Sequence, residues 1–147
     1  MEPRLRAAGG FTFPELVAVI VIVAVLAAVA VPRFNQGAID TTWFAEQVKA
    51  AVRYAQRQAV AQRRLVYVAV DGPPSAQLRL CYDAACTQPL RNLTNGGTYV
   101  LTVPGTVTLS ASSTPFWFNG LGEPSSAVTL SVNGIGVSVA SETGYVQ

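Results

Sequence analysis

Apolar and polar positions follow three successive patterns along this chain of 147 residues. In the first, Val, Ile, Leu and Ala run almost without interruption over residues 16–31, with one carboxylate, Glu15, at the entrance. Counted from Phe11, the run reaches about 20 residues, enough to span a bilayer core of roughly 30 Å as a helix. Arg4 and Arg6 precede it, and such basic flanks stay cytoplasmic, so the rest of the chain should face outward.

The second pattern has a helical period and covers residues 41–64. Asp40, Thr41 or Thr42 can cap the start of this helix. Pro32 separates it from the first run and should kink or locally unwind the helical path. The apolar stripe of this helix, which is expected to pack under the rest of the chain, consists of Phe44, Val48, Ala51, Val52, Ala55 and Ala59.

After Arg64 the period shortens to two, which is typical of strands. Turn signals rich in Gly, Pro and Asn divide this part, and Asn133-Gly134 among them favours a hairpin, although a longer loop is possible. The three patterns predict an α+β fold, a long N-terminal helical spine with a small antiparallel β-sheet head packed on its C-terminal half. The predicted strands are residues 65–70, 77–82, 98–103, 106–110, 116–118, 128–132 and 136–140.

Composition argues against catalysis. The chain has no histidine, and a formal net charge of +2 produces no field that favours nucleic acid. Asp71, Asp83, Glu123 and Glu142 are isolated acids in turns or near the C-terminus, where turn chemistry explains them. Calcium between Asp71 and Asp83 would need a loop rich in oxygen ligands, which the sequence does not offer. We therefore predict no enzyme, no cofactor and no metal site.

The two cysteines, Cys81 and Cys86, stand in the string CYDAAC. This is not the CxxC spacing of a redox or zinc site, and further ligands are missing. In an exported chain the pair is expected to form a disulfide across a small loop, which would stabilise the fold modestly and mainly fix a turn. A reduced, buried pair is the alternative.

The string from Gly10 to Leu16, GFTFPEL, closely resembles the class III signal of type IV pilins and pseudopilins. The resemblance implies that a dedicated prepilin peptidase cuts after Gly10 and that the new N-terminal Phe11 is then methylated. It also implies that Glu15 neutralises the N-terminal amine of the next subunit as helices stack in a filament. Pro32 would accompany the flexible or unwound segment that assembled filaments of this family contain.

The same resemblance implies a type IV pilin fold in three parts. Residues 1–10 form the cleaved leader, residues 11–31 the transmembrane and filament-core helix, and residues 32–147 a periplasmic or extracellular head. The head would comprise an amphipathic helix, residues 41–64, and a β-rich part, residues 65–147. The subunit would cross the bacterial inner membrane once and then join a pilus or pseudopilus. Its expected partners are other major and minor pilins, the prepilin peptidase and the inner-membrane assembly platform.

An ordinary secretory signal is the main rival interpretation of the N-terminus. Residues 28–30 would then be the small-x-small cleavage site, and a soluble binding domain starting at Val31 would be released. Such a signal has no use for paired glycines before Phe11 or for Glu15 at the entrance of the apolar run. We therefore favour the pilin-type signal.

Three later stretches narrow the family. Residues 48–70, 116–124 and 141–146 resemble a helix-to-strand passage, a phenylalanine-turn-glycine segment and a C-terminal strand of minor pilins in the GspH/FimT group. The last stretch is especially similar to minor pilins of mannose-sensitive haemagglutinin-type pili. The resemblance implies a minor pilin that acts in filament assembly, priming or at the tip. A type II secretion pseudopilin is the close alternative, because the head fold is shared.

Some members of this group act as DNA receptors through arginines in the C-terminal region. Where such members show LGRP and TGRV, this chain has LGEP at residues 121–124 and TGYV at residues 143–146. It has no Lys or Arg after Arg91, and phosphate contacts need cations. A C-terminal DNA site, and with it a role as a DNA-binding competence pilin, is therefore not expected.

The densest basic patch lies on the second helix and contains Arg53, Arg57, Arg63 and Arg64. Arg53 and Arg57 are one helical turn apart, so a phosphate or an acidic partner could bridge them as a weak anion or DNA site. A solvated face of an amphipathic helix is the better interpretation, because charge runs usually have that role.

Aromatic residues could also stack on bases, but a helix under a sheet usually buries them. We therefore expect Trp43, Phe44 and Tyr54 to belong to the core. Trp117 lies within the strand 116–118, where alternation exposes one side of the aromatic trio. An exposed Trp117 would contact a neighbouring subunit.

Overall fold

The structure is a computed structural model that describes residues 11–30, 36–72 and 76–147. The chain divides into two compact units, one ending at residue 35 and the other, called the head from here on, covering residues 36–147. The expected cleavage residue Gly10 and the expected kink at Pro32 lie outside the described residues.

The first helix, α1 (Phe13–Ala30), is apolar on every side. Its large apolar side chains are exposed, from 44% at Val17 to 80% at Phe13. With 18 residues it measures about 27 Å at 1.5 Å per residue. Among the helices of the described residues, none combines the length and the apolar character needed to cross a membrane.

The second helix, α2 (Gln36–Gln62), begins before the start that the capping residues predicted. Thr41 and Thr42 lie inside it, where their hydroxyl groups donate to the carbonyl oxygens of Gly37 at 2.7 Å and Ala38 at 3.0 Å. The predicted start of this helix was wrong, because a threonine whose hydroxyl group bonds to the preceding turn can lie inside a helix as well as at its cap. The predicted apolar stripe is confirmed, because each of its six residues is at most 1% exposed.

The C-terminal end of α2 reverses the chain through Arg63, whose φ of 48° is left-handed. The N–H of Arg64 donates to the carbonyl oxygen of Ala59 at 3.2 Å, and that of Arg63 to Val60 at 3.3 Å. This is the Schellman pattern, in which glycine usually takes the left-handed position. Gly120 packs on this end, since a Cβ there would lie 3.1 Å from the Cα of Arg63.

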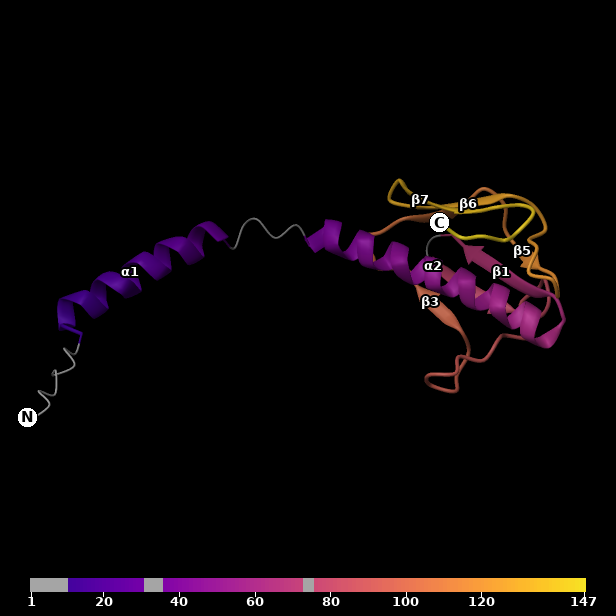
Figure 1. Ribbon diagram of the computed structural model, residues 1–147, viewed down its shortest axis with the longest axis horizontal. Helices are drawn as coiled ribbons and strands as arrows, with labels where there is room; N and C mark the ends of the chain where they lie inside the picture. Colours follow the sequence, from indigo (N-terminus) through magenta and orange to yellow (C-terminus); the bar gives the residue numbers. More distant parts are fainter. Residues whose placement is uncertain (1–10, 31–35, 73–75) are drawn as a thin grey trace, which may run out of the picture. The chain divides into compact units, whose positions relative to one another are not determined.

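Seven antiparallel strands follow α2 and form two sheets, with the orders β3-β2-β1-β5 and β4-β6-β7. Strands of both sheets pack against α2, which runs along them in Figure 1. The predicted α+β head is confirmed; the strands predicted at 116–118 and 128–132 are found with those bounds, and the other five with shifted ends. The observed bounds are β1 (Val66–Asp71), β2 (Gln77–Cys81), β3 (Val100–Thr102), β4 (Leu109–Ala111), β5 (Phe116–Phe118), β6 (Val128–Val132) and β7 (Ile135–Val139).

The hydrophobic core lies between α2 and the strands. Val66 and Val68 of β1 are fully buried, and Val68 stands opposite Leu80 of β2 and Phe116 of β5. Side chains that alternate along a strand point to opposite faces, so the buried valines share the face that α2 covers. Burial of apolar surface stabilises a fold by roughly 25 cal/mol per Å², so the packing of α2 on the strands is the main stabilising contribution in the head.

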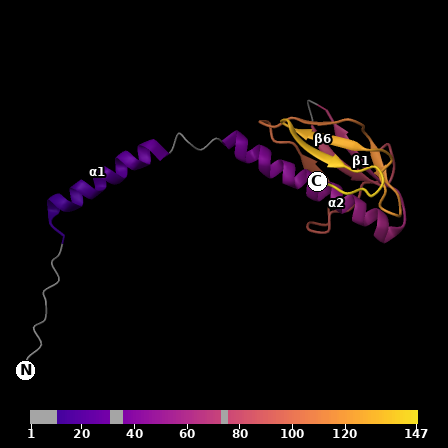
Figure 2. The ribbon, with the colours of Figure 1, turned by 45° about the horizontal axis from the view of Figure 1, so that its top comes forward.

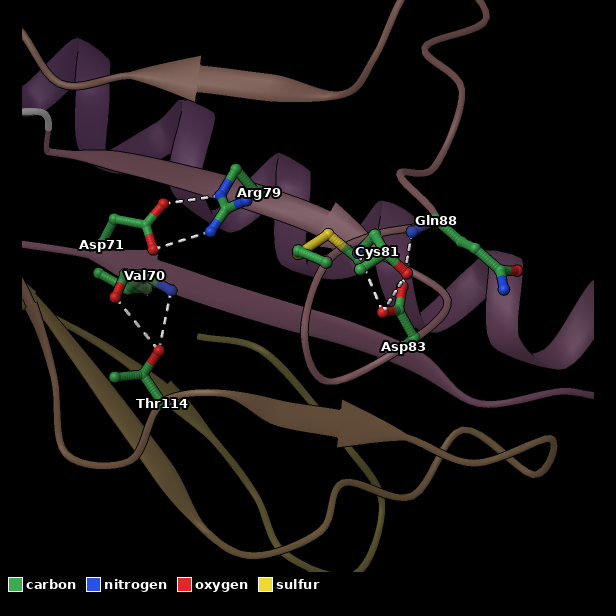
Figure 3. Close-up of a disulfide and its surroundings, with 9 residues drawn as sticks. Val70, Asp71, Arg79, Cys81, Asp83, Gln88 and Thr114 are labelled. Carbon is green, nitrogen blue, oxygen red and sulfur yellow. Dashed lines mark hydrogen bonds and ion pairs between the residues drawn. A yellow bond between two sulfur atoms is a disulfide. The ribbon is translucent and has the colours of Figure 1, made fainter.

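The end of β1 is completed by a side chain instead of a strand. β5 pairs with β1 only over Val66–Val68, which leaves the backbone of Val70 without a partner from β5. The Thr114 hydroxyl oxygen accepts from the N–H of Val70 at 2.9 Å and donates to its carbonyl oxygen at 3.3 Å (Figure 3). Pro115 follows and has no N–H for a ladder, so the hydroxyl replaces the missing strand pair.

The second sheet is joined to α2 through its hairpin turn. Asn133 and Gly134 have φ values of 47° and 87°, as a two-residue type I′ turn requires, so the predicted tight hairpin is confirmed. The Asn133 amide nitrogen donates to the Thr41 hydroxyl at 2.9 Å and to the Thr106 carbonyl at 3.2 Å. Its amide oxygen accepts from the N–H and the hydroxyl of Thr108, both at 2.8 Å. One side chain therefore holds the hairpin, the loop before β4 and the helix together.

Candidate functional site

The entrance to α1 is a helix cap built from Thr12 and Glu15. The Thr12 carbonyl oxygen accepts from the N–H groups of Glu15 at 3.0 Å and Leu16 at 3.1 Å, and the Glu15 carboxylate lies 3.5 Å from the N–H of Thr12. Pro14 lies in the first turn, where its missing N–H does little harm. This is one half of a Thr-x-x-Glu capping box. It holds the exposed Glu15 carboxylate beside the backbone of Thr12, the residue that follows Phe11.

The exposed face of α2 near its N-terminus carries an apolar groove. Ile39 and Trp43 are 55% and 62% exposed, one helical turn apart. Together with Ala38, Thr42 and Glu46 they line a groove of about 550 Å³. This surface faces away from the core, because Phe44 on the next position is only 1% exposed.

The aromatic residues divide between core and surface. The expectation that Trp43 is a core residue was wrong, since the helix turns it to solvent, whereas Phe44 is buried as expected. Tyr54 is half-buried and stacks on Tyr99 with ring centroids 5.1 Å apart. Trp117 is half-buried on the face of β5 opposite its two buried phenylalanines.

The arginines of the predicted patch have different surroundings. Arg53 donates to the carbonyl oxygen of Val146 at 2.9 Å, and the guanidinium of Arg64 lies over the Tyr82 ring, 3.8 Å from its centroid. Arg57 and Arg63 are exposed. The structure thus gives Arg53 and Arg64 local partners, while an anion site that uses all four stays a prediction.

Cys81 and Cys86 form the predicted disulfide, with Cα atoms 5.1 Å apart (Figure 3). Asp83 organises the same loop: its carboxylate accepts from the backbone N–H of Gln88 at 2.7 Å and from the N–H and hydroxyl of Thr87 at 2.9 and 2.8 Å. The N–H of Gln88, followed by that of Thr87, stabilises the charged form and lowers the pKa of Asp83 below its ordinary value. The loop is therefore fixed by a covalent bond and a carboxylate together.

Asp71 is also engaged. Its carboxylate receives two hydrogen bonds from the Arg79 guanidinium, at 2.6 and 3.0 Å, across the β1–β2 pair (Figure 3). Over residues 11–30, 36–72 and 76–147, no three His, Cys, Asp or Glu side chains come close enough together to hold a metal ion. Asp71 and Asp83 each act within their own part of the fold.

Two turns that are distant in the sequence meet beside α2, a contact that was not predicted from the sequence. In the first, the Asn119 side-chain oxygen accepts from the N–H groups of Leu121 at 2.9 Å and Glu123 at 3.0 Å. In the second, the N–H of Gly144 donates to Ala140 at 2.9 Å. These turns, residues 119–123 and 140–145, are called the two-turn platform below.

Gln56 of α2 joins the two turns of the platform. Its amide nitrogen donates to the carbonyl oxygens of Gly122 at 2.9 Å and Thr143 at 3.0 Å. Gly144 packs directly on the Gly122 carbonyl, because a Cβ at Gly144 would overlap that oxygen. The C-terminal segment, yellow in Figures 1 and 2, accordingly returns beside α2, where Arg53 also holds it. The structure thus brings together at one surface two motifs that are separate in the sequence, residues 121–124 and 143–146.

No sequence family matches this chain, and no curated protein matches it by sequence. Solved structures do. The type IV minor pilin FimU of Pseudomonas aeruginosa is similar over 72% of this chain and 85% of its own, with 21% identity and a TM-score of 0.56. The minor pseudopilin EpsH of the type 2 secretion system of Vibrio cholerae is similar over 74% of this chain and 94% of its own, with 13% identity and a TM-score of 0.56. The chain therefore has the minor pilin and pseudopilin fold.

Proposed function

We propose that this protein is a minor pilin or pseudopilin, a structural subunit of a type IV pilus-type filament that acts in assembly, priming or at the tip. One combination carries the proposal: a head with the fold of FimU and EpsH follows an apolar helix whose entrance presents Glu15. A shared fold alone does not establish a function. The apolar helix adds a surface that needs partners, because its side chains are exposed from Phe13 to Leu26.

The N-terminal chemistry follows from the signal. We propose cleavage after Gly10, methylation of Phe11 and pairing of Glu15 with the amine of a neighbouring subunit. The exposed Glu15 carboxylate is held at the first turn of α1, where it is available to a second chain. Within a filament core that excludes water, an ion pair is stronger than at a surface.

Location and partners are proposed on the same basis. Residues 11–31 would hold the precursor in the inner membrane, with the leader on the cytoplasmic side and the head in the periplasm. The prepilin peptidase and the assembly platform would act on the precursor in that membrane. Other pilins would then cover the apolar helix. A narrower place among minor pilins of mannose-sensitive haemagglutinin-type pili rests on residues 141–146.

A type II secretion pseudopilin is the second candidate. It is supported by one observation: the similarity covers 94% of EpsH, against 85% and 90% of the two FimU structures, at a TM-score of 0.56. Comparing wild-type and deletion strains for pilus production and for secretion of type II substrates separates the two machines.

The first experiment is the intact mass and N-terminal sequence of the protein purified from its native membrane. We expect a chain that starts at methylated Phe11. A chain that starts at Val31 would mean that the apolar run is discarded, and the filament proposal would fall with it.

The role of Glu15 is tested with two variants, Glu15→Ala and Glu15→Gln. The glutamine keeps an oxygen that can accept from the N–H of Thr12 and removes only the charge. If the ion pair drives assembly, both variants are cleaved normally and both are depleted from filaments. Normal filament content of either variant would contradict the proposed pairing, and loss in the alanine variant alone would assign Glu15 to the helix cap.

A further inference from the structure

Ile39 and Trp43 stand apart from the other apolar side chains of α2. They are 55% and 62% exposed, whereas the buried stripe of the same helix is closed to solvent, and they line the groove described above. A single exposed isoleucine is ordinary, but a tryptophan is on average largely buried, so an exposed one beside an apolar groove needs a reason. The first turn of α2 extends past the strands (Figures 1 and 2), so this surface is accessible.

The groove follows closely on the apolar helix in the chain. α1 ends at Ala30 and α2 begins at Gln36. Because a chain spans at most about 3.6 Å per residue, it cannot carry Gln36 farther than about 22 Å from Ala30, and Ile39 follows within one helical turn. If residues 11–31 occupy the inner membrane, as proposed above, the groove is tethered near a lipid surface. A short tether gives effective concentrations in the mM range, so two side chains that bind weakly are enough.

The chemistry of the groove suits the layer between lipid headgroups and acyl chains. Tryptophan is enriched in this layer, because its ring is apolar while its N–H can bond to water or headgroups. The charges nearby cancel: residues 31–50 contain two cations and two carboxylates, and Glu46 pairs with Lys49 at 2.9 Å. A balanced segment is not drawn to anionic lipids as a polybasic one would be. The apolar side chains therefore have to supply the contact.

We propose that the groove on α2 rests in the headgroup layer of the inner membrane while the subunit waits there for assembly. Ile39 and Trp43 enter the boundary between headgroups and acyl chains, and the Glu46–Lys49 ion pair stays at the aqueous rim. Withdrawal of the subunit into a filament breaks this contact. The inference rests on the proposed membrane stage of the precursor and adds a second contact with the bilayer, made by the head.

The test uses fluorescence of the full chain reconstituted into phosphatidylcholine vesicles. The chain has two tryptophans, so Trp117→Phe leaves only Trp43, and Trp43→Phe leaves only Trp117, which is half-buried in β5, as the control. The acyl chains carry bromine, a short-range quencher, either near the headgroup or near the terminal methyl group. We expect headgroup-side bromine to remove about half of the Trp43 emission and leave Trp117 unchanged, since interfacial faces lie about 5–10 Å deep.

The other outcomes separate the inference from the function on which it rests. A chain that floats with the vesicles but shows equal quenching at both tryptophans, or stronger quenching of Trp43 by the deep bromine, would overturn the interfacial contact alone. Shielding of Trp43 that follows the protein-to-lipid ratio and not bromine would assign the groove to a second copy and also overturn it. A chain that does not float would overturn the membrane stage and the inference together.

A matched pair of variants tests the groove itself. Ile39→Ser and Val60→Ser each remove an exposed apolar side chain from α2, and Val60 lies about 30 Å farther along the helix at 1.5 Å per residue. In the Trp117→Phe background we expect only Ile39→Ser to reduce the quenching of Trp43. Circular dichroism of both variants checks that the head is folded, and equal quenching in the two variants would refute a contact through the groove.

Lipid charge provides the last control. Because the charges around the groove cancel, adding anionic phosphatidylglycerol to the vesicles should leave the quenching of Trp43 unchanged. Quenching that appears only with the anionic lipid would show an electrostatic contact and overturn the apolar one.

Discussion

Gly144 allows a sharp test of how the two-turn platform is held together. Its φ is 64°, and a Cβ added there would overlap the carbonyl oxygen of Gly122 and crowd the amide of Gln56. Gly134 is the matched control, because its φ of 87° is equally left-handed but a Cβ there would have no atom within 4 Å. Alanine at either glycine pays the same backbone penalty, and only at Gly144 does it also meet an obstacle.

The magnitudes follow from these contacts. Gly134→Ala should cost about 1 kcal/mol, the usual penalty for a left-handed residue with a side chain. Gly144→Ala adds the loss of two Gln56 hydrogen bonds, about 1 kcal/mol each, and overpacking of about 1 kcal/mol or more. The total is about 4 kcal/mol, so the two variants should differ by about 3 kcal/mol.

Urea unfolding of the head, followed by circular dichroism, gives both free energies from the midpoints and slopes. Gln56→Ala in the Gly144→Ala background should then add little, because its hydrogen bonds are already lost. If the two glycine variants agree within about 0.5 kcal/mol, the close contact between the turns does not exist as described, and the platform loses its physical basis.

Three further predictions concern the head. Phe44→Ala should destabilise it by about 3–5 kcal/mol while Trp43→Ala stays within about 1 kcal/mol in the same urea assay, because one ring is buried and its neighbour is exposed. The pKa of Asp83 is lowered in the folded state, so its contribution to the stability of the head is complete above the ordinary aspartate pKa and is lost as the pH falls through the lowered value. The melting temperature of Asp83→Asn should therefore fall less steeply at acid pH than that of the wild type. Replacing Cys81 and Cys86 together by Ser should cost about 2 kcal/mol, as expected for a short loop, measured by urea unfolding.

Each of these predictions can fail clearly. Equal losses for the two aromatic variants would place both rings in the same environment. An unchanged acid limb for Asp83→Asn would show that the carboxylate does not hold its loop. A cysteine variant as stable as the oxidised wild type would mean that Asp83 alone fixes the turn.

Local periodicity was enough to predict the parts of the fold that depend on neighbouring residues. The buried stripe of α2 follows from the 3.6-residue period, and the strands β5 and β6 and the hairpin at Asn133-Gly134 follow from alternation and turn chemistry. The start of α2 was missed because a threonine serves as well within a helix, bonded to the preceding turn, as it does at a cap. The helical period also does not tell which of two adjacent aromatics, Trp43 or Phe44, lies at the edge of the buried stripe.

The two-turn platform was out of reach for a different reason. It depends on the approach of Gly122 to Gly144 and on a single amide, Gln56, that bonds to both turns. Such contacts join residues far apart in the chain, and the sequence shows each glycine only as an ordinary turn signal. The glycines at both turns were the available clue, since a close backbone approach is one reason for a glycine.

The Asn133–Gly134 turn has a further consequence, which concerns how the protein ages. Asparagine before glycine readily loses its amide as ammonia, because the unhindered glycine nitrogen can attack the side-chain carbonyl carbon. In the folded head the hydrogen bonds with Thr41, Thr106 and Thr108 hold that amide away from its own backbone. Attack would require the amide to give up all of them, so the contacts that join the second sheet to α2 also slow deamidation. A copy that unfolds loses this protection and acquires a negative charge at the position where helix and hairpin must rejoin.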